Sequence, residues 1–372
     1  MPDFVLLHEI GYGSGQWLPM VRSTALSRWA ELSTDSLRGS ASPASMADSR
    51  RMIPPELAQV NIFTTSQLRE RGIGQDEVRR AVNQGELVRL KRGWYTRLAR
   101  DQPSERHRLR VLTELADHPG TVPSHYSGAI HLGLPVHRPD WGRVHLMRTT
   151  SGPAQNRAHV VIHRRVPEAT QADPALIIAQ TALFCPISGL MSLDKALRDG
   201  TVTLADFERW SKLLVGRPGH QHLRVVRRLT DERRESPLES QTALVFDRWG
   251  WWIEPQFPVP GTSYRADGRL KGTRVLIECD GLGKYDEPGA QVREKLREDD
   301  IRALDWEVVR VTSELLDEPL TLARRVKAAL DRASASRVER ASRPQHRVVP
   351  DQLRDTTPTA EPTDHTRRSQ HR

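Results

Sequence analysis

The sequence predicts a multidomain protein of mixed α/β and α+β class. The chain has 372 residues, more than one ordinary domain holds, so two or three domains are expected. A helix–turn–helix–hairpin pattern occupies residues 52–100, and an α-β-β-β-α-β order of elements begins at residue 235. Residues 101–234 lie between them. We therefore expect a small helical module, a helical or mixed middle region, and a C-terminal sheet domain.

The composition favours a polyanionic partner. Lys and Arg number 56 against 47 Asp and Glu, for a formal net charge of +9, and the sequence pI is about 10.0. Nucleic acid is the simplest such partner; an Arg-rich surface that serves solubility alone is the alternative. Cys185 and Cys279 lie in apolar surroundings and exclude a disulfide framework or a cysteine metal cluster.

No long apolar run and no signal pattern occur, so a soluble, cytoplasmic protein without membrane contact is expected. Residues 1–51 lack sustained periodicity, and we expect a disordered segment or an over-extended gene start, with Met46 or Met52 as the initiator. Residues 333–372 are rich in Pro, Thr, Arg and His. They cannot bury enough apolar surface to fold alone, which predicts a disordered basic tail.

Residues 52–100 have the pattern of a winged helix-turn-helix. A short first helix carries Leu57, Val60 and Phe63. A second helix is capped by Thr64-Thr65, and a glycine turn leads to a third helix over 75–83. A basic hairpin over 87–96 comes next as the wing.

The third helix and the wing carry side chains that suit DNA. Polar groups on the helix would reach base edges in the major groove, and the basic wing would contact phosphates. The alternatives are an ordinary charged face and a winged helix that binds protein. The candidate DNA-binding residues are Gln75, Arg79, Arg80, Asn83, Arg89, Lys91 and Arg92.

Residues 63–68, Gly72-Ile73 and 88–95 resemble the N-terminal domain of AbiEi-type antitoxins from type IV toxin–antitoxin systems. The resemblance covers about residues 54–100, and its most specific stretch is Arg92-Gly93-Trp94-Tyr95. It implies a winged helix that binds operator DNA for autoregulation. The C-terminal domain of these antitoxins does not resemble residues 101–372 of this chain. A cognate toxin or another defence protein therefore stays open as a partner, and the oligomeric state is unknown.

Residues 101–234 are predicted to be a mixed connecting region. Six histidines between residues 125 and 163 show no metal-ligand spacing, so scattered surface and core histidines are expected. Ser124 and His125 are adjacent and should point apart, which argues against a hydrolase triad. The predicted helices cover 105–117, 175–184, 190–197 and 204–214, and β-like runs cover 143–147 and 159–163.

Residues 235–332 have the element order of the PD-(D/E)xK, restriction-endonuclease-like core. The predicted elements are a helix over 237–249, strands over 251–257, 264–267 and 275–280, a helix over 291–304, a strand over 306–311 and a helix over 320–330. Five stretches resemble the domain related to very-short-patch repair endonucleases, which is found behind winged helices in actinobacteria. They are residues 235–240, 264–267, 277–281 with Lys284-Tyr285, 294–299 and 309–311.

Four carboxylates in this region predict a metal site. Asp267 and Glu278 end neighbouring strands, and Asp280 shares a strand face with Glu278. Glu239 comes from the preceding helix. Burying such carboxylates costs several kcal/mol unless a cation neutralises them. Hard oxygen ligands suit Mg²⁺ or Mn²⁺, which would activate water to hydrolyse a phosphodiester.

The usual lysine of this nuclease family is replaced by Asp280, and Lys284 or Lys295 would supply the positive charge instead. Gly268 and Asp305 are further departures. Two hypotheses result. The first is a Mg²⁺-dependent DNA endonuclease in defence or repair, with RNA open as the substrate. The second is a catalytically inactive, antitoxin-like autoregulator that binds operator DNA, its nuclease-like module kept for DNA binding or oligomerisation.

Overall fold

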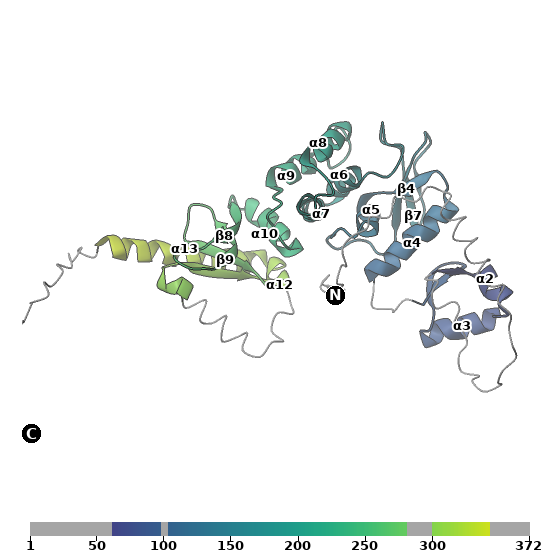
Figure 1. Cartoon of the computed structure of the whole chain (residues 1–372), viewed down its shortest axis with the longest axis horizontal. Coiled ribbons are helices and arrows are strands. Elements are labelled where there is room, and N and C mark those ends of the chain that lie inside the picture. Colours follow the sequence, from purple (N-terminus) through teal and green to yellow (C-terminus); the bar gives the residue numbers. More distant parts are fainter. Residues whose placement is uncertain (1–61, 98–102, 281–299, 343–372) are drawn as a thin grey trace, which may run out of the picture.

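The computed structural model describes residues 62–97, 103–280 and 300–342, with side chains to residue 335. Three parts, each with its own sheet, succeed one another along the long axis of the molecule (Figure 1). This confirms the predicted mixed α/β multidomain class. The predicted disordered segments lie mostly outside the described residues. Among the helices that are described, none combines the length and apolar character that crossing a membrane requires.

The N-terminal part packs two helices against a three-stranded antiparallel sheet of order β1-β3-β2. Thr64 and Gln67 form a capping box at the start of α2, since each side chain accepts a hydrogen bond from the other's backbone N–H. Gly85 ends α3 in the left-handed conformation, with φ 80°. The elements are β1 (Phe63–Thr64), α2 (Thr65–Glu70), α3 (Gln75–Gln84), β2 (Val88–Lys91) and β3 (Trp94–Thr96).

Phe63 does not belong to a helix as predicted, because it pairs with Tyr95 across β1 and β3. Its ring is fully buried in the core of this part, together with Leu68 and Leu87. Helical spacing of apolar residues therefore does not distinguish a helix from a strand of only two residues, such as β1.

The middle part begins with a four-stranded sheet of order β4-β5-β7-β6, in which β5 and β7 are parallel. Helices α4 and α5 contact this sheet. The predicted helix over 105–117 and the predicted strands over 143–147 and 159–163 are present within two residues. The elements are α4 (Pro103–Asp117), β4 (Thr121–Pro123), α5 (His125–His131), β5 (Val144–Arg148), β6 (Gln155–Asn156) and β7 (Val160–His163).

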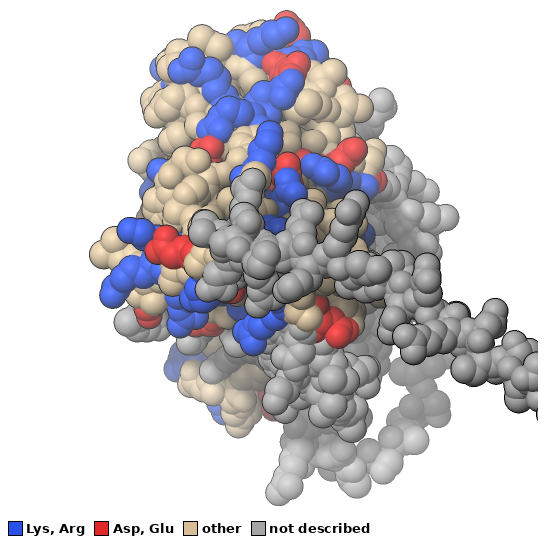
Figure 2. Space-filling view, turned by 90° about the vertical axis from the view of Figure 1, so that its left-hand side faces the viewer, with Lys and Arg blue, Asp and Glu red and all other residues tan. Residues whose placement is uncertain are grey.

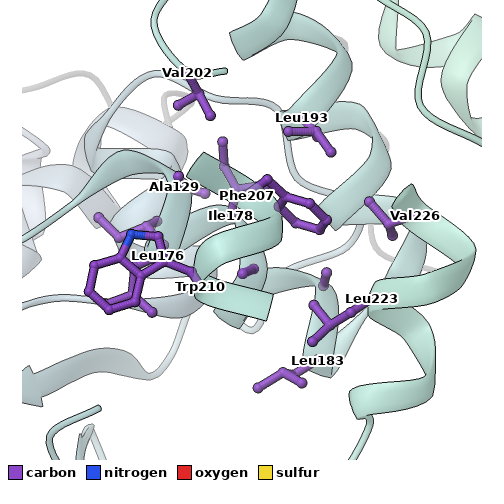
Figure 3. Close-up of a cluster of buried hydrophobic side chains, with 14 of the residues drawn as sticks. Ala129, Leu176, Ile178, Leu183, Leu193, Val202, Phe207, Trp210, Leu223 and Val226 are labelled. Atoms are coloured by element: carbon purple, nitrogen blue, oxygen red, sulfur yellow. The ribbon is translucent and has the colours of Figure 1, made fainter. Parts of the chain in front are cut away.

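Four helices complete the middle part and hold the largest apolar cluster of the described chain (Figure 3). Ala175 through Leu183 are all buried, so α6 forms its centre. Gly189 of α7 allows a close crossing, because a Cβ there would lie 2.4 Å from Cβ of Ala182. The middle is thus a folded core rather than mainly a connection. Its helices are α6 (Pro174–Phe184), α7 (Pro186–Arg198), α8 (Leu204–Leu213) and α9 (His220–Leu229).

The C-terminal part is a four-stranded sheet of order β11-β10-β9-β8, parallel between β10 and β11 and otherwise antiparallel. Buried side chains of α10, α12 and α13 pack on one face, and Ile301 and Trp306 belong to a second cluster with Ala266 and Leu276. The elements are α10 (Pro237–Asp247), β8 (Ile253–Pro258), β9 (Arg265–Leu270), β10 (Val275–Cys279), β11 (Glu307–Val311), α12 (Ser313–Leu316) and α13 (Pro319–Ser342).

The predicted order of helix and strands is present in this part. The helix over 291–304 is described only from residue 300. Helix α13 continues to Ser342, so residues 333–342 are helical where a disordered tail was predicted. The order of elements does not by itself identify a nuclease, and that assignment stays a prediction.

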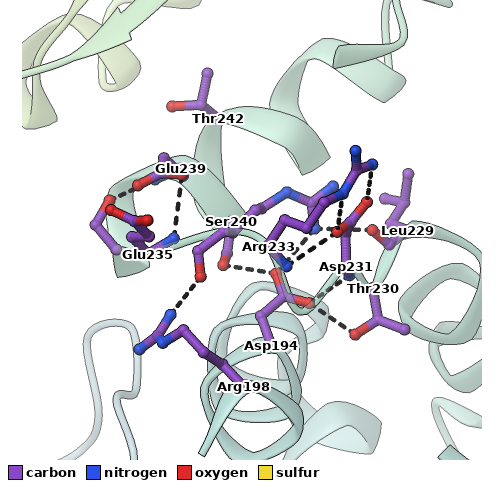
Figure 4. Close-up of polar contacts among 12 residues, drawn as sticks. Asp194, Arg198, Leu229, Thr230, Asp231, Arg233, Glu235, Glu239, Ser240 and Thr242 are labelled. Atoms are coloured by element: carbon purple, nitrogen blue, oxygen red, sulfur yellow. Dashed lines mark hydrogen bonds and ion pairs between the residues drawn. The ribbon is translucent and has the colours of Figure 1, made fainter. Parts of the chain in front are cut away.

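A buried polar network joins α7 to α10 (Figure 4). The carboxylate of Asp194 accepts hydrogen bonds from Arg234 Nη1 at 2.8 Å, Ser240 Oγ at 2.7 Å, Thr230 Oγ1 at 2.7 Å and Asp231 N at 2.9 Å. The side chains of Arg234 and Asp194 are only 3% and 1% exposed. The network therefore ties the middle helices to the first helix of the C-terminal part.

Candidate functional site

One outer face of α3 presents polar side chains to solvent. Gln75, Arg79 and Asn83 recur every four residues, so they form one stripe along the helix, and Arg80 lies beside it. Arg79 pairs with Asp76 at 3.3 Å, an exposed contact that a phosphate or base could replace. Of the seven predicted DNA contacts, six are exposed: Gln75, Arg79, Arg80, Asn83, Arg89 and Arg92.

Lys91, the seventh, faces the protein. Its Nζ lies 2.6 Å from Asp117 Oδ2 and 3.3 Å from Glu114 Oε1, both on α4. It also donates to the carbonyl of Thr113 at 2.8 Å. Only 13% of the Lys91 side chain is exposed. The structure therefore places Lys91 at the joint between the wing and α4, where it is poorly available to a phosphate.

We expect Lys91→Ala to loosen this joint and Arg92→Ala to weaken DNA binding. Removing the ammonium leaves Glu114, which is 6% exposed, short of a partner, at a cost of about 1–3 kcal/mol. Hydrogen exchange should rise in β2, β3 and the end of α4. The slope of log affinity against log salt should fall by about 1 in Arg92→Ala alone. A fall of that size in Lys91→Ala would contradict this assignment.

Glu239 and Asp267 line one small pocket between α10 and the sheet, together with Arg234 and Cys279. The pairing of β9 with β10 stops at Gly268 opposite Ile277. Beyond that point Asp267 Oδ2 accepts a hydrogen bond from Cys279 N at 2.7 Å. The Asp267 carboxylate thus accepts the hydrogen bond that a backbone carbonyl of β9 would accept if the pairing of β9 with β10 continued.

Packing explains why position 268 is a glycine rather than the larger strand residue expected from the resemblance. A Cβ at this position would lie 2.4 Å from Cγ2 of Ile253 on the neighbouring strand β8. A side chain here would push β8 away from β9. The glycine therefore keeps the strand beside Asp267 closely paired, and it is compatible with an intact pocket.

Glu239 is held in its place by neutral donors. Its Oε2 accepts from Gln256 Nε2 at 2.9 Å and from Glu235 N at 3.2 Å. Burial raises the pKa of the Glu239 carboxyl, and the negative charge of nearby Asp267 raises it further. Two carboxylates that disfavour each other's charge share this pocket, an arrangement that a cation would relieve.

Glu239→Gln should raise the free energy of unfolding at neutral pH in metal-free buffer. The folded-state pKa of Glu239 lies above the ordinary 4.5, so the wild type loses stability as pH rises through the unfolded pKa towards the folded one. The advantage of the variant should shrink below pH 4.5, where both states are protonated. Urea titrations at two pH values measure it. A variant that is less stable at neutral pH would contradict the expectation.

Glu278 and Asp280 lie beside a different group. The parallel register places Glu278 opposite Arg310 of β11, and Asp280 Oδ2 lies 3.5 Å from Arg310 Nη1. Alternation along β10 sends Ile277 and Cys279 into the core beneath α10, so Glu278 belongs to the other face.

The sequence predicted a metal ion as the counter-charge for Glu278 and Asp280. In the structure the guanidinium of Arg310 supplies positive charge beside them. Of the four predicted metal ligands, Glu239 and Asp267 share the pocket, and Glu278 and Asp280 are not among the described residues that line it. Lys284 and Lys295 lie outside the described residues. The site residues therefore stay predictions, and Glu239 and Asp267 are the two that line a common pocket.

The expectation of scattered histidines is wrong for three of the six. His125, His145 and His163 come together, with ligand nitrogens all within 4.8 Å of one another. Ser124 and His125 do not point apart either, because His125 adopts φ 52° and its Nδ1 lies 3.0 Å from Ser124 Oγ. The parallel pairing of β5 with β7 brings His145 and His163 together. The spacing of the histidines in the sequence does not predict this pairing.

Comparisons with known proteins support the N-terminal part of this description. Two uncharacterised proteins of Mycobacterium tuberculosis, MT2308 of strain CDC 1551 / Oshkosh and Rv2248 of strain ATCC 25618 / H37Rv, are each 28% identical over 271 residues. The matches cover 68% of this chain and 95% of each relative. Residues 51–97 match a family described as transcriptional regulator, AbiEi antitoxin. The N-terminal domain is therefore similar to the transcriptional-regulator domain of AbiEi antitoxins.

Proposed function

We propose that this protein is a DNA-binding transcriptional regulator that acts on its own operator. The observation that carries the proposal is the exposed stripe of Gln75, Arg79 and Asn83 on α3, within a segment that matches AbiEi-type regulators. A helix of this kind fits the major groove, where Arg reads guanine and Asn reads adenine in bidentate fashion. Arg89 and Arg92 of the exposed wing would contact the flanking phosphates.

The charge of the whole molecule supports a nucleic-acid partner. The net charge is +9, and Lys and Arg side chains spread widely over the face shown in Figure 2, with Asp and Glu among them. Such a surface adds non-specific attraction that salt weakens. Sequence discrimination must then come from α3. A cognate toxin belongs to the same proposal as a protein partner, since the matched family is an antitoxin family.

Fluorescence anisotropy with duplex DNA tests the regulator. The probes are the region upstream of the gene and a shuffled duplex of equal length and composition. We expect tighter binding to the upstream region at every salt concentration, with affinity for both falling as salt rises. Equal binding to both duplexes would reject an operator-specific regulator. Absence of binding to either would reject DNA binding altogether.

A second candidate function is metal-dependent cleavage of nucleic acid, which the pocket of Glu239 and Asp267 favours. Their oxygens suit Mg²⁺ or Mn²⁺, and the pKa of Glu239, raised by burial and further by the negative charge of Asp267, means that a cation placed between them would be favoured. A bound ion would polarise a phosphate and activate water. Glu239 and Asp267 would hold it, with Gln256 orienting Glu239.

Plasmid and linear-duplex cleavage in Mg²⁺ or Mn²⁺ tests the second candidate. Asp267→Asn is the informative variant, because an amide oxygen can still accept the hydrogen bond from Cys279 N. Glu307→Gln on β11, whose carboxylate pairs with Arg332, is the matched control. Metal-dependent cleavage that Asp267→Asn abolishes and Glu307→Gln keeps would support the nuclease. If the wild type binds DNA but does not cleave it, the nuclease is rejected and the transcriptional regulator remains as the proposed function.

A further inference from the structure

We propose that His125, His145 and His163 form a binding site for a divalent transition-metal ion of the zinc class. The three rings come from three rigid elements: the first residue of α5, the strand β5 and the end of β7. Imidazole nitrogen is the ligand that Zn²⁺, Cu²⁺, Ni²⁺ and Co²⁺ share. Three histidines with a fourth position left open is a recurrent arrangement for zinc.

The nitrogens already converge. Nδ1 of His145 lies 2.9 Å from Nε2 of His163, and one ligand nitrogen from each of the three residues lies within 4.8 Å of the others. A tetrahedral ion with Zn–N bonds of about 2.0–2.1 Å needs nitrogens roughly 3.3 Å apart. The closest pair must therefore separate slightly, and the widest pair must close by at most about 1.5 Å. Small rotations about the side-chain torsions of the histidines supply such movements.

The surroundings keep the imidazoles neutral, which is the form that binds metals. Burial lowers the pKa of His145 to about 3 and that of His163 to about 4. His125 is buried and its pKa is lowered for the same reason. Ser124 Oγ, 3.0 Å from Nδ1 of His125, fixes that ring and leaves Nε2 as its ligand atom. Metal-binding histidines usually have such a partner on the other nitrogen.

The backbone at His125 adds a second indication. Its φ of 52° is left-handed, a conformation that is unfavourable for a residue with a side chain and is concentrated at functional sites. The conformation turns the imidazole towards β5 and β7, where its ring lies 3.8 Å from that of His163 between centroids. A helix start chosen for stability alone would not require a buried histidine in this conformation.

Phe184 lies against one side of the cluster. Its side chain is 55% exposed, and its ring is nearly perpendicular to all three imidazoles. The charge of Arg217 acts on His125 and His163, so an anion is the favoured fourth ligand beside a cationic metal. The site would therefore hold the ion through three neutral histidines, with water, hydroxide or a small anion as the fourth ligand.

The alternative is a hydrogen-bonded histidine pair that only fills the core, and metal titration distinguishes the two. Tag-free full-length protein, stripped with chelator, is titrated with Zn²⁺ by calorimetry. We expect one ion per chain. His163→Asn and His125→Asn should each weaken binding by more than about 100-fold, beyond the roughly 10–100-fold that loss of an outer partner costs. Asn is chosen at residue 125 because it tolerates the left-handed conformation.

Two controls separate the site from surface binding. His159→Asn removes an exposed histidine beside the same strand and should bind Zn²⁺ as the wild type does. Ser124→Ala should fall between the wild type and the ligand variants, since it loses only the hydrogen bond to His125.

Thermal melting keeps the test decisive if a variant folds poorly. A ligand that binds the folded state raises its melting temperature, so Zn²⁺ should raise that of the wild type and of His159→Asn. Two results would overturn the proposal. One is a wild type that neither binds Zn²⁺ nor melts at a higher temperature with it. The other is a folded His163→Asn variant that binds as tightly as the wild type.

Discussion

Asp194→Ala should lower the free energy of unfolding by about 3–5 kcal/mol, the usual loss when one partner of a buried ion pair is removed. The substitution strands the Arg234 guanidinium, whose side chain is 3% exposed. It also removes the acceptor of Ser240 Oγ and Thr230 Oγ1. Because these groups join α7 to α10, the loss should affect the middle and C-terminal parts together.

Urea denaturation followed by circular dichroism measures this loss. Asp199→Ala is the matched control, because Asp199 directly succeeds the same helix and pairs with Lys195 at 2.7 Å across four residues. That pair is about one-third exposed, so its removal should cost no more than about 0.5 kcal/mol. If the two substitutions lowered the free energy of unfolding equally, the network around Asp194 would not stabilise the contact between α7 and α10.

Local signals in the sequence predicted most of the secondary structure. Thr64 before a short helix and Gly85 after the next are capping residues, and they mark the start of α2 and the end of α3, the latter predicted to within one residue. Pro237 likewise marks the first turn of α10. Helix α9 was missed although Leu223, Val226 and Leu229 repeat every three residues and all are buried. Its signal was present in the sequence and could have been found.

Contacts between distant segments set the limit of prediction for the candidate sites. The sequence predicts Lys91 to be a DNA-contacting residue of the wing. Only the packing of the wing on α4 brings it to Asp117. Asp280 reads as a metal ligand until the parallel pairing of β10 and β11 brings Arg310 to it. The three clustered histidines depend on the pairing of β5 with β7 in the same way. In each case the decisive neighbour lies at least 18 residues away in sequence.

Arg79→Ala combined with Arg80→Ala should weaken binding to the upstream duplex by about 100-fold or more, since each arginine–base contact contributes roughly 1–3 kcal/mol. Both side chains are exposed on α3, and alanine is the residue that best preserves a helix. Binding to a shuffled duplex should fall less, because that binding depends on charge rather than on base contacts.

The control must remove the same charge from elsewhere, because basic groups are spread over the face shown in Figure 2. Arg224→Ala combined with Arg325→Ala does this with exposed residues of α9 and α13. If net charge alone drives binding, the two double variants should weaken both duplexes equally. If α3 reads bases, only the α3 variant should lose the preference for the upstream region. A retained preference in that variant would mean that another element recognises the DNA, and the assignment of α3 would fail.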